Sequence, residues 1–144
     1  MTALRISVAI ALWIAFAAHG QDTSFRAVDV YVNSGAQPLA AYQLTFLSTG
    51  ANVKIVGIEG GEHSAFAEAP YYDPKAMQRE QVTIAAFNTA AANQLPTGRT
   101  RVATIHVQAD VKSQRTYKVE VSAAAAAGGK AISVQANVEE RMTR

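Results

Sequence analysis

The sequence contains no cysteine, which excludes several kinds of protein at once. Without a thiol the chain has no disulfide scaffold, no thiolate metal site, no cysteine nucleophile and no lipid-bearing N-terminal cysteine. Charged residues are scarce at 17%, and a formal net charge of +2 excludes a polyanion-binding protein that relies on bulk charge. The hydrophobic fraction of 49% is too high for intrinsic disorder. A chain of 144 residues with this balance fits one small globular domain.

A hydrophobic run long enough to span a bilayer is also lacking. Residues 6–18 carry no charge and follow Arg5, but they fall short of the ~20 residues that a transmembrane helix needs. Ala18 and Gly20 are small residues placed as at a cleavage site before Gln21. The pattern predicts a cleavable signal-peptide helix at residues 1–20 and export to a bacterial periplasm or exterior. The alternatives are a buried core helix and a retained signal anchor.

Alternation of apolar and polar residues with period two dominates the rest of the chain. Alternation of this kind gives each strand one apolar and one polar face, which suits antiparallel sheets stacked on a shared core. The sequence therefore predicts an all-β fold, an antiparallel two-sheet β-sandwich of the Ig-like or jelly-roll type with about seven to nine strands. The expected strands lie at residues 28–32, 42–46, 53–58, 82–87, 103–108, 117–121 and 132–138.

These strands define a predicted core and predicted domain boundaries. The alanine run 123–127 is too short to form an isolated helix, and it predicts a strand end and the turn of a hairpin joining residues 117–121 to 132–138. The sandwich is expected to cover residues 21–139, and residues 140–144 are expected to form a flexible polar tail. The expected core residues are Val30, Leu44, Phe46, Ile55, Ile84, Ile105, Val119 and Val134.

One segment, residues 59–79, lacks alternation. We expect Gly60 and Gly61 to let the chain leave its strand at an angle that other residues resist. Long loops in small domains tend to be functional, so this loop is the candidate recognition edge. The alternative is a crossover between the two sheets with a short helical turn near residues 74–78.

The loop also carries the candidate binding residues, which are Tyr71, Tyr72, Asp73, Glu62 and His63. Flanking prolines are expected to hold the two tyrosines extended, with their rings pointing in opposite directions, so that at most one ring is inward. A tyrosine ring offers an apolar face and a hydroxyl to a protein or glycan partner.

The sequence supports a catalytic or metal site less well than a binding site. The histidine and carboxylates of residues 59–73 are of types that bind calcium or zinc, but their spacing matches no EF-hand loop and no paired-histidine zinc motif. A solvated acidic loop is the simpler interpretation. No serine occupies a nucleophile elbow, and His106 is expected on the outward face of a strand. We therefore expect no catalytic residue, no metal and no cofactor.

The order of several stretches resembles the cohesin-like family of secreted β-sandwich modules, which are related to some carbohydrate-binding modules. The matching stretches are residues 28–32, 39–46, 53–61, 81–87 and 96–105, and the resemblance covers residues 25–138. It implies a non-catalytic module that binds a protein through one sheet face, binds glycan, or belongs to a surface structure. The loop at residues 70–74 departs from cellulosomal cohesins.

The sequence thus predicts a non-catalytic exported recognition module that binds a protein or glycan partner at the cell envelope. The alternative is a structural subunit of an extracellular or surface assembly, such as a filament, layer or adhesin. Residues 21–98 hold four basic and seven acidic residues, and residues 99–144 hold eight and four. This difference predicts a polar face that pairs with another protein or with a copy of the chain, and the alternative is charge scattered over interleaved strands that cancels in space. Nucleic acid is not an expected partner, and membrane contact is expected only through the signal peptide before cleavage.

Overall fold

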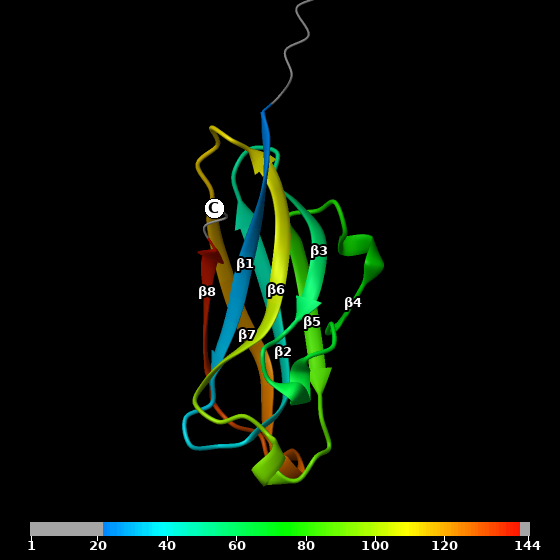
Figure 1. Cartoon of the computed structure of the whole chain (residues 1–144), viewed down its shortest axis with the longest axis vertical. Helices are drawn as coiled ribbons and strands as arrows, with labels where there is room; N and C mark the ends of the chain where they lie inside the picture. The colour runs from blue at the N-terminus through cyan, green and yellow to red at the C-terminus, as the bar shows by residue number, and fades with distance from the viewer. Residues whose placement is uncertain (1–21, 142–144) are drawn as a thin grey trace, which may run out of the picture.

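The computed structural model describes residues 22–141, which form two four-stranded antiparallel sheets packed on a common core (Figure 1). The strand orders are β3-β6-β1-β8 in one sheet and β4-β5-β2-β7 in the other. The predicted antiparallel β-sandwich is therefore confirmed. The strands are β1 (Thr23–Asn33), β2 (Leu39–Thr49), β3 (Lys54–Gly60), β4 (Tyr71–Tyr72), β5 (Gln81–Phe87), β6 (Arg99–Asp110), β7 (Thr116–Ala126) and β8 (Gln135–Arg141).

The alternation in the sequence directs apolar side chains into the space between the sheets. On β1, Val28, Val30 and Val32 are fully buried, because successive side chains of a strand point to opposite faces. Six of the eight expected core residues are likewise fully buried. The other two, Val119 and Val134, are partly buried and pack against the same core. Val119 is less covered because β7 is the outermost strand of its sheet.

The prediction of a hairpin between the last two strands was wrong. The chain does turn back after β7, where Ala125 and Ala131 form an isolated antiparallel bridge. It then crosses to the other sheet, where β8 pairs with β1 and not with β7. A local turn signal does not specify which strand the following segment joins, since β1 lies about a hundred residues earlier in the sequence and is brought near only by the fold.

The flexible tail was predicted to begin at residue 140, but β8 extends through Arg141. Glu140 lies opposite Val28 of β1 and faces the core side of its sheet. There its carboxylate contacts the guanidinium groups of Arg26 and Arg115. These ion pairs explain how a polar sequence continues as a strand.

Residues 59–79 form the crossover from β3 in one sheet to β5 in the other, which was the alternative interpretation of this segment (Figure 1). The short edge strand β4 lies within it, between the 3-10 turns η1 (Ser64–Phe66) and η2 (Pro74–Ala76). The two other 3-10 turns are η3 (Ala92–Gln94) and η4 (Ala127–Gly129). Alternation could not reveal β4, because a two-residue strand covers a single period and the pattern never repeats.

Within residues 22–141, no helix has the length and apolar character needed to cross a membrane. The signal-peptide helix and cleavage point predicted at residues 1–20 lie outside the described residues.

Candidate functional site

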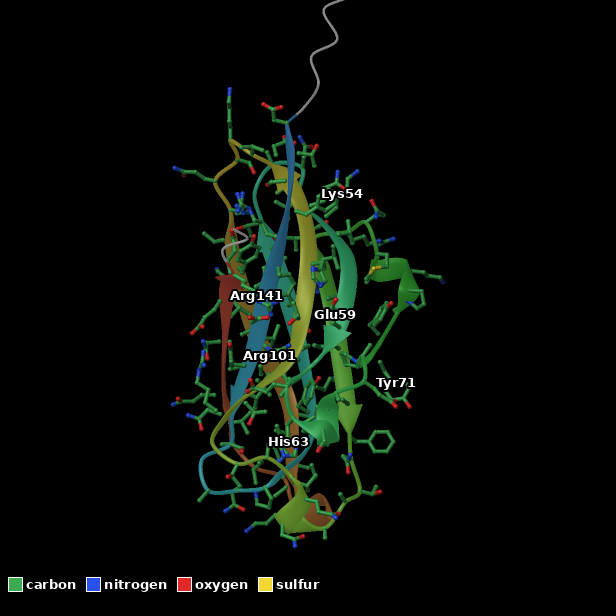
Figure 2. The ribbon with its side chains drawn as sticks, viewed as in Figure 1. Lys54, Glu59, His63, Tyr71, Arg101 and Arg141 are labelled. Carbon is green, nitrogen blue, oxygen red and sulfur yellow. The ribbon has the colours of Figure 1, made fainter. Side chains whose placement is uncertain are left out.

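An exposed pair of aromatic rings stands on the outer face of the sheet that contains β4. Tyr71 lies opposite Ala85 of β5, and Phe87 follows two residues later on the same face. The two ring centroids are 6.4 Å apart, and the ring planes differ by only 13°. Tyr71 is 72% exposed and Phe87 is 66% exposed. We call this pair the aromatic ridge; Figure 2 shows Tyr71 projecting from the side of the molecule.

An apolar groove of about 430 Å³ lies beside the aromatic ridge. Seven of its lining residues are alanines, supplied by β2, β5, β7 and the turn after β7. The side chain of Gln43 is its main polar group, and its Nε2 donates a hydrogen bond to Ser122 Oγ at 3.0 Å. The small side chains leave the faces of the aromatic rings uncovered. The groove thus offers apolar contact area and few hydrogen-bonding groups.

A second hollow, of about 400 Å³, is also lined by Tyr71 and Phe87. Its other lining residues come from η1, from residues 68–70 and from Ala86 and Asn88, and they include Ser64 and Glu68. The side-chain amide of Asn88 links the residue after β5 to η1, because its Nδ2 donates a hydrogen bond to the Ala65 carbonyl at 3.1 Å. The aromatic ridge is therefore bordered by both an apolar and a more polar surface.

Tyr71 and Tyr72 differ in orientation, as the sequence predicted for neighbours on extended backbone. Tyr72 lies opposite Ile84, a fully buried residue, and so points to the inner side of its sheet. It is 36% exposed because β4 is an edge strand. Asp73 is not part of the ridge surface: its Oδ1 accepts a hydrogen bond from the Lys75 backbone N–H at 2.9 Å and caps η2.

Glu62 and His63 line neither of the two hollows beside the aromatic ridge, and Figure 2 shows His63 apart from Tyr71. Both side chains contact backbone groups. His63 Nδ1 accepts from the Ala65 N–H at 3.1 Å, and Glu62 Oε1 accepts from the Arg101 N–H at 2.8 Å. A binding role for these two residues together with the tyrosines stays a prediction from the sequence. The His63 hydrogen bond closes a local turn, whereas the Glu62 hydrogen bond joins the crossover to β6.

The carboxylates of the crossover are dispersed. Glu59, at the end of β3, lies beside His106 of β6, with Oε1 and Nε2 3.2 Å apart. Residues 22–141 hold no group of three or more His, Asp or Glu side chains arranged to bind a metal ion. His106 faces outward from its strand, and its side chain is 34% exposed.

The two glycines that begin the crossover are required by close packing and not by an unusual backbone angle. Neither has a positive φ. A Cβ on Gly60 would lie 2.1 Å from the Ala67 carbonyl oxygen, and one on Gly61 would lie 2.2 Å from the Arg101 carbonyl oxygen. The expectation of a special chain angle was wrong at both positions. Absence of a side chain lets the crossover pack against the end of β3 at Gly60 and against β6 at Gly61.

Sequence reasoning missed Phe87, although a signal for it was present. In residues 82–87 the inward positions are Val82, Ile84 and Ala86, so Phe87 falls on the face that also carries Thr83. A large aromatic residue in the polar phase of an alternating strand is expected to be exposed, because its side chain points to the face of the sheet that lies away from the core. Its proximity to Tyr71 depends on the pairing of β4 with β5.

No family model, no curated protein and no solved structure matches this chain. The resemblance to cohesin-like modules remains a prediction from the sequence.

Proposed function

We propose that this chain is a non-catalytic exported recognition module that binds a protein or glycan partner at the cell envelope. The observation that carries the proposal is the aromatic ridge, Tyr71 and Phe87, exposed side by side next to an alanine-lined groove. Large aromatic side chains are enriched at binding hot spots, where they supply most of the binding free energy. Isolated exposed apolar residues are ordinary, whereas a paired arrangement beside a groove is typical of an interaction site.

Strand pairing around the aromatic ridge favours binding, because it lowers the conformational entropy that the two rings lose when a partner binds. Tyr71 is held in β4 by pairing with β5, and Phe87 lies at the end of β5 itself. Ring positions fixed before binding reduce the conformational entropy that is lost when a partner docks. Parallel ring faces also suit the apolar face of a sugar or an apolar side chain of a protein.

The polar residues of the crossover support a non-catalytic role. His63 and Asp73 each accept a hydrogen bond from a backbone N–H of their own turn, and Glu62 accepts one from the Arg101 N–H of β6. A general acid or base needs to reach a substrate, and these groups are directed toward the chain's own backbone.

The experiment compares Tyr71→Ala and Phe87→Ala with the matched control Phe25→Ala. Phe25 is 63% exposed and lies on β1, in the other sheet. Each protein is applied to a glycan array, and each is used to retain partners from the envelope fraction of the native host. We expect both ridge variants to lose at least tenfold in binding of whichever partner the wild type retains, and the control to bind normally.

A thermal melt of each variant separates binding from folding. Because both ring positions are largely exposed, we expect their melting temperatures to remain within a few degrees of that of the wild type. Equal retention of partners by the wild type and both ridge variants would show that the aromatic ridge is not the binding surface.

The second candidate function is a structural subunit of a surface assembly. The outer edge of β7 supports it, because among the residues that the structure describes no strand pairs with much of this edge. Unpaired strand edges are the usual route by which β-proteins assemble with copies of themselves.

A further inference from the structure

The structure points to a two-fold dimer of this chain, formed by antiparallel pairing of β7 with β7 of a second copy. β7 is the terminal strand of the order β4-β5-β2-β7, so β2 covers only one of its edges. After residue 122 the outer edge is occupied: the Ala126 N–H bonds to the Lys130 carbonyl and the Ile132 N–H bonds to the Ala124 carbonyl. Residues 116–122 have no strand on their outer side within the described chain.

Two charged residues in this free stretch lack partners of opposite charge in their own sheet. Lys118 lies opposite Leu47, and Glu120 lies opposite Thr45. Both side chains are exposed, and neither forms an ion pair within residues 22–141. They share one face of β7, because residues two apart on a strand point the same way.

The order of these residues is complementary to itself. When two copies of β7 pair antiparallel about Val119, Lys118 lies opposite Glu120 of the second copy, and Glu120 lies opposite its Lys118. Directly opposed charges of opposite sign stabilise an antiparallel pair. A two-fold interface forms each such contact twice, which is the arrangement that a symmetric dimer requires.

The inner face of the same stretch also gains from this pairing. Tyr117, Val119 and Val121 pack against the core but stay partly exposed, because β7 is the terminal strand of its sheet within residues 22–141. Pairing about Val119 places Tyr117 opposite Val121 of the second copy, on the inner side of the sheet. Apolar surface that one molecule leaves half-covered is then buried by the other.

The neighbouring edge strand shows how this chain blocks strand addition elsewhere. β8 directs Glu140 inward, where it contacts Arg26 and Arg115. An inward-facing charge is one of the devices that keep an edge strand from pairing with another molecule. The inward positions of β7 in residues 116–122 are Tyr117, Val119 and Val121, none of which is charged. The absence of such protection distinguishes β7 from β8.

Dimerisation would join the β4-β5-β2-β7 sheets of the two copies into one sheet of eight strands, with β4 of each copy at its two ends. Seven strand spacings of ~4.8 Å place the two copies of β4 roughly 34 Å apart on one continuous sheet. Two aromatic ridges on one particle would bind a repetitive partner with higher avidity. This consequence rests on the proposed function, whereas the dimer itself does not.

The test measures the oligomeric state of the chain, recovered from the soluble exported fraction of a bacterial host, by light scattering and sedimentation over a range of concentrations. Since a strand-edge contact is small, we expect a concentration-dependent dimer with a dissociation constant on the order of 10–100 µM. Each of the single variants Lys118→Glu and Glu120→Lys places two like charges opposite each other in both contacts. Each should therefore raise the dissociation constant at least tenfold. Lys112→Glu, the same charge change in the turn before β7, should leave it unchanged.

Charge exchange provides the decisive control. The double variant Lys118→Glu with Glu120→Lys restores both opposite-charge contacts and should dimerise like the wild type. A mixture of the two single variants should form a mixed dimer, although each alone is monomeric. Amide hydrogen exchange in residues 116–122 should slow as wild-type concentration rises. A wild type that stays monomeric at about 1 mM, or a dimer indifferent to these variants, would overturn the proposal.

Discussion

Arg141, at the end of β8, donates two hydrogen bonds to the carboxylate of Asp29 on β1. Arg141 Nη2 donates to Asp29 Oδ1 at 2.5 Å, and Nε donates to Oδ2 at 3.2 Å. Thr104 Oγ1 of β6 also donates to Oδ1, at 2.7 Å, and itself accepts from Arg101 Nη1 at 2.9 Å. Asp29 lies on the outward face of its strand and is still only 8% exposed. One carboxylate thus joins three adjacent strands, β6, β1 and β8.

Removal of this contact should destabilise the sandwich at the β8 edge. We expect Arg141→Ala to lower the free energy of unfolding by about 2 kcal/mol, because it leaves a buried carboxylate with fewer charge-assisted hydrogen bonds. Arg141→Lys should recover only part of the loss, since an ammonium group cannot form the two-point contact. Urea unfolding followed by circular dichroism measures both values.

The control for the Arg141 variants is Glu139→Gln, on the same strand as Arg141, which removes the exposed ion pair between Glu139 and Arg99 of β6. Exposed pairs contribute at most about 1 kcal/mol, so this variant should be close to the wild type. An Arg141→Ala protein as stable as the Glu139→Gln protein would contradict the structural role of the contact.

Stability should fall in acid because two carboxylates are held in their ionised form. Burial raises the pKa of Asp29, but hydrogen bonds from Arg141 and Thr104 and the charges of Arg141 and Arg101 outweigh it, so the net pKa is lowered. Hydrogen bonding to Arg115 lowers the pKa of Glu140. A carboxylate whose pKa is lower in the folded state stabilises the fold above its unfolded pKa, and this contribution is lost as pH falls through the folded value.

We therefore expect a constant free energy of unfolding between about pH 5 and 8 and a decline below about pH 4. In the double variant Asp29→Asn with Glu140→Gln, the decline should be smaller. Urea unfolding at a series of pH values tests this. An equally steep decline in the double variant would assign the acid sensitivity to other groups.

Alkaline pH should also destabilise the protein, through a buried phenol. Burial raises the pKa of Tyr117 to about 12. A phenol with a raised pKa stabilises the fold below its unfolded pKa of about 10, and this contribution is lost as pH rises toward the folded value. Tyr117→Phe should therefore lose less stability between about pH 10 and 12 than the wild type, as measured by urea unfolding.

The close approach of the crossover to the end of β3 predicts a sharp difference between two glycines of that strand. Gly60→Ala should lower the free energy of unfolding by about 1–3 kcal/mol, because its Cβ would overlap the Ala67 carbonyl and force the backbone to move. Gly57→Ala, three residues earlier on β3, should be nearly neutral, since its Cβ would make an ordinary 3.6 Å contact with His106. Similar melting temperatures for the two variants would mean that the crossover adapts.

The sequence by itself determined the all-β fold, the two-sheet sandwich and the position of most strands. Period-two alternation follows from the geometry of a single strand, so it can be read without knowing which strands are neighbours. The same local geometry placed Tyr71 and Tyr72 on opposite sides of their strand. Phe46 and Ile105 could be assigned to the core because they lie in the apolar phase of that pattern.

Only the tertiary structure decided which distant segments meet. Pairing of β4 with β5 places Tyr71 beside Phe87, and pairing of β8 with β1 brings Arg141 to Asp29. Such pairings depend on chain crossovers and on the burial of complete sheet faces, which no local pattern contains. The sequence therefore identified one ring of the aromatic ridge, and the fold supplied the other.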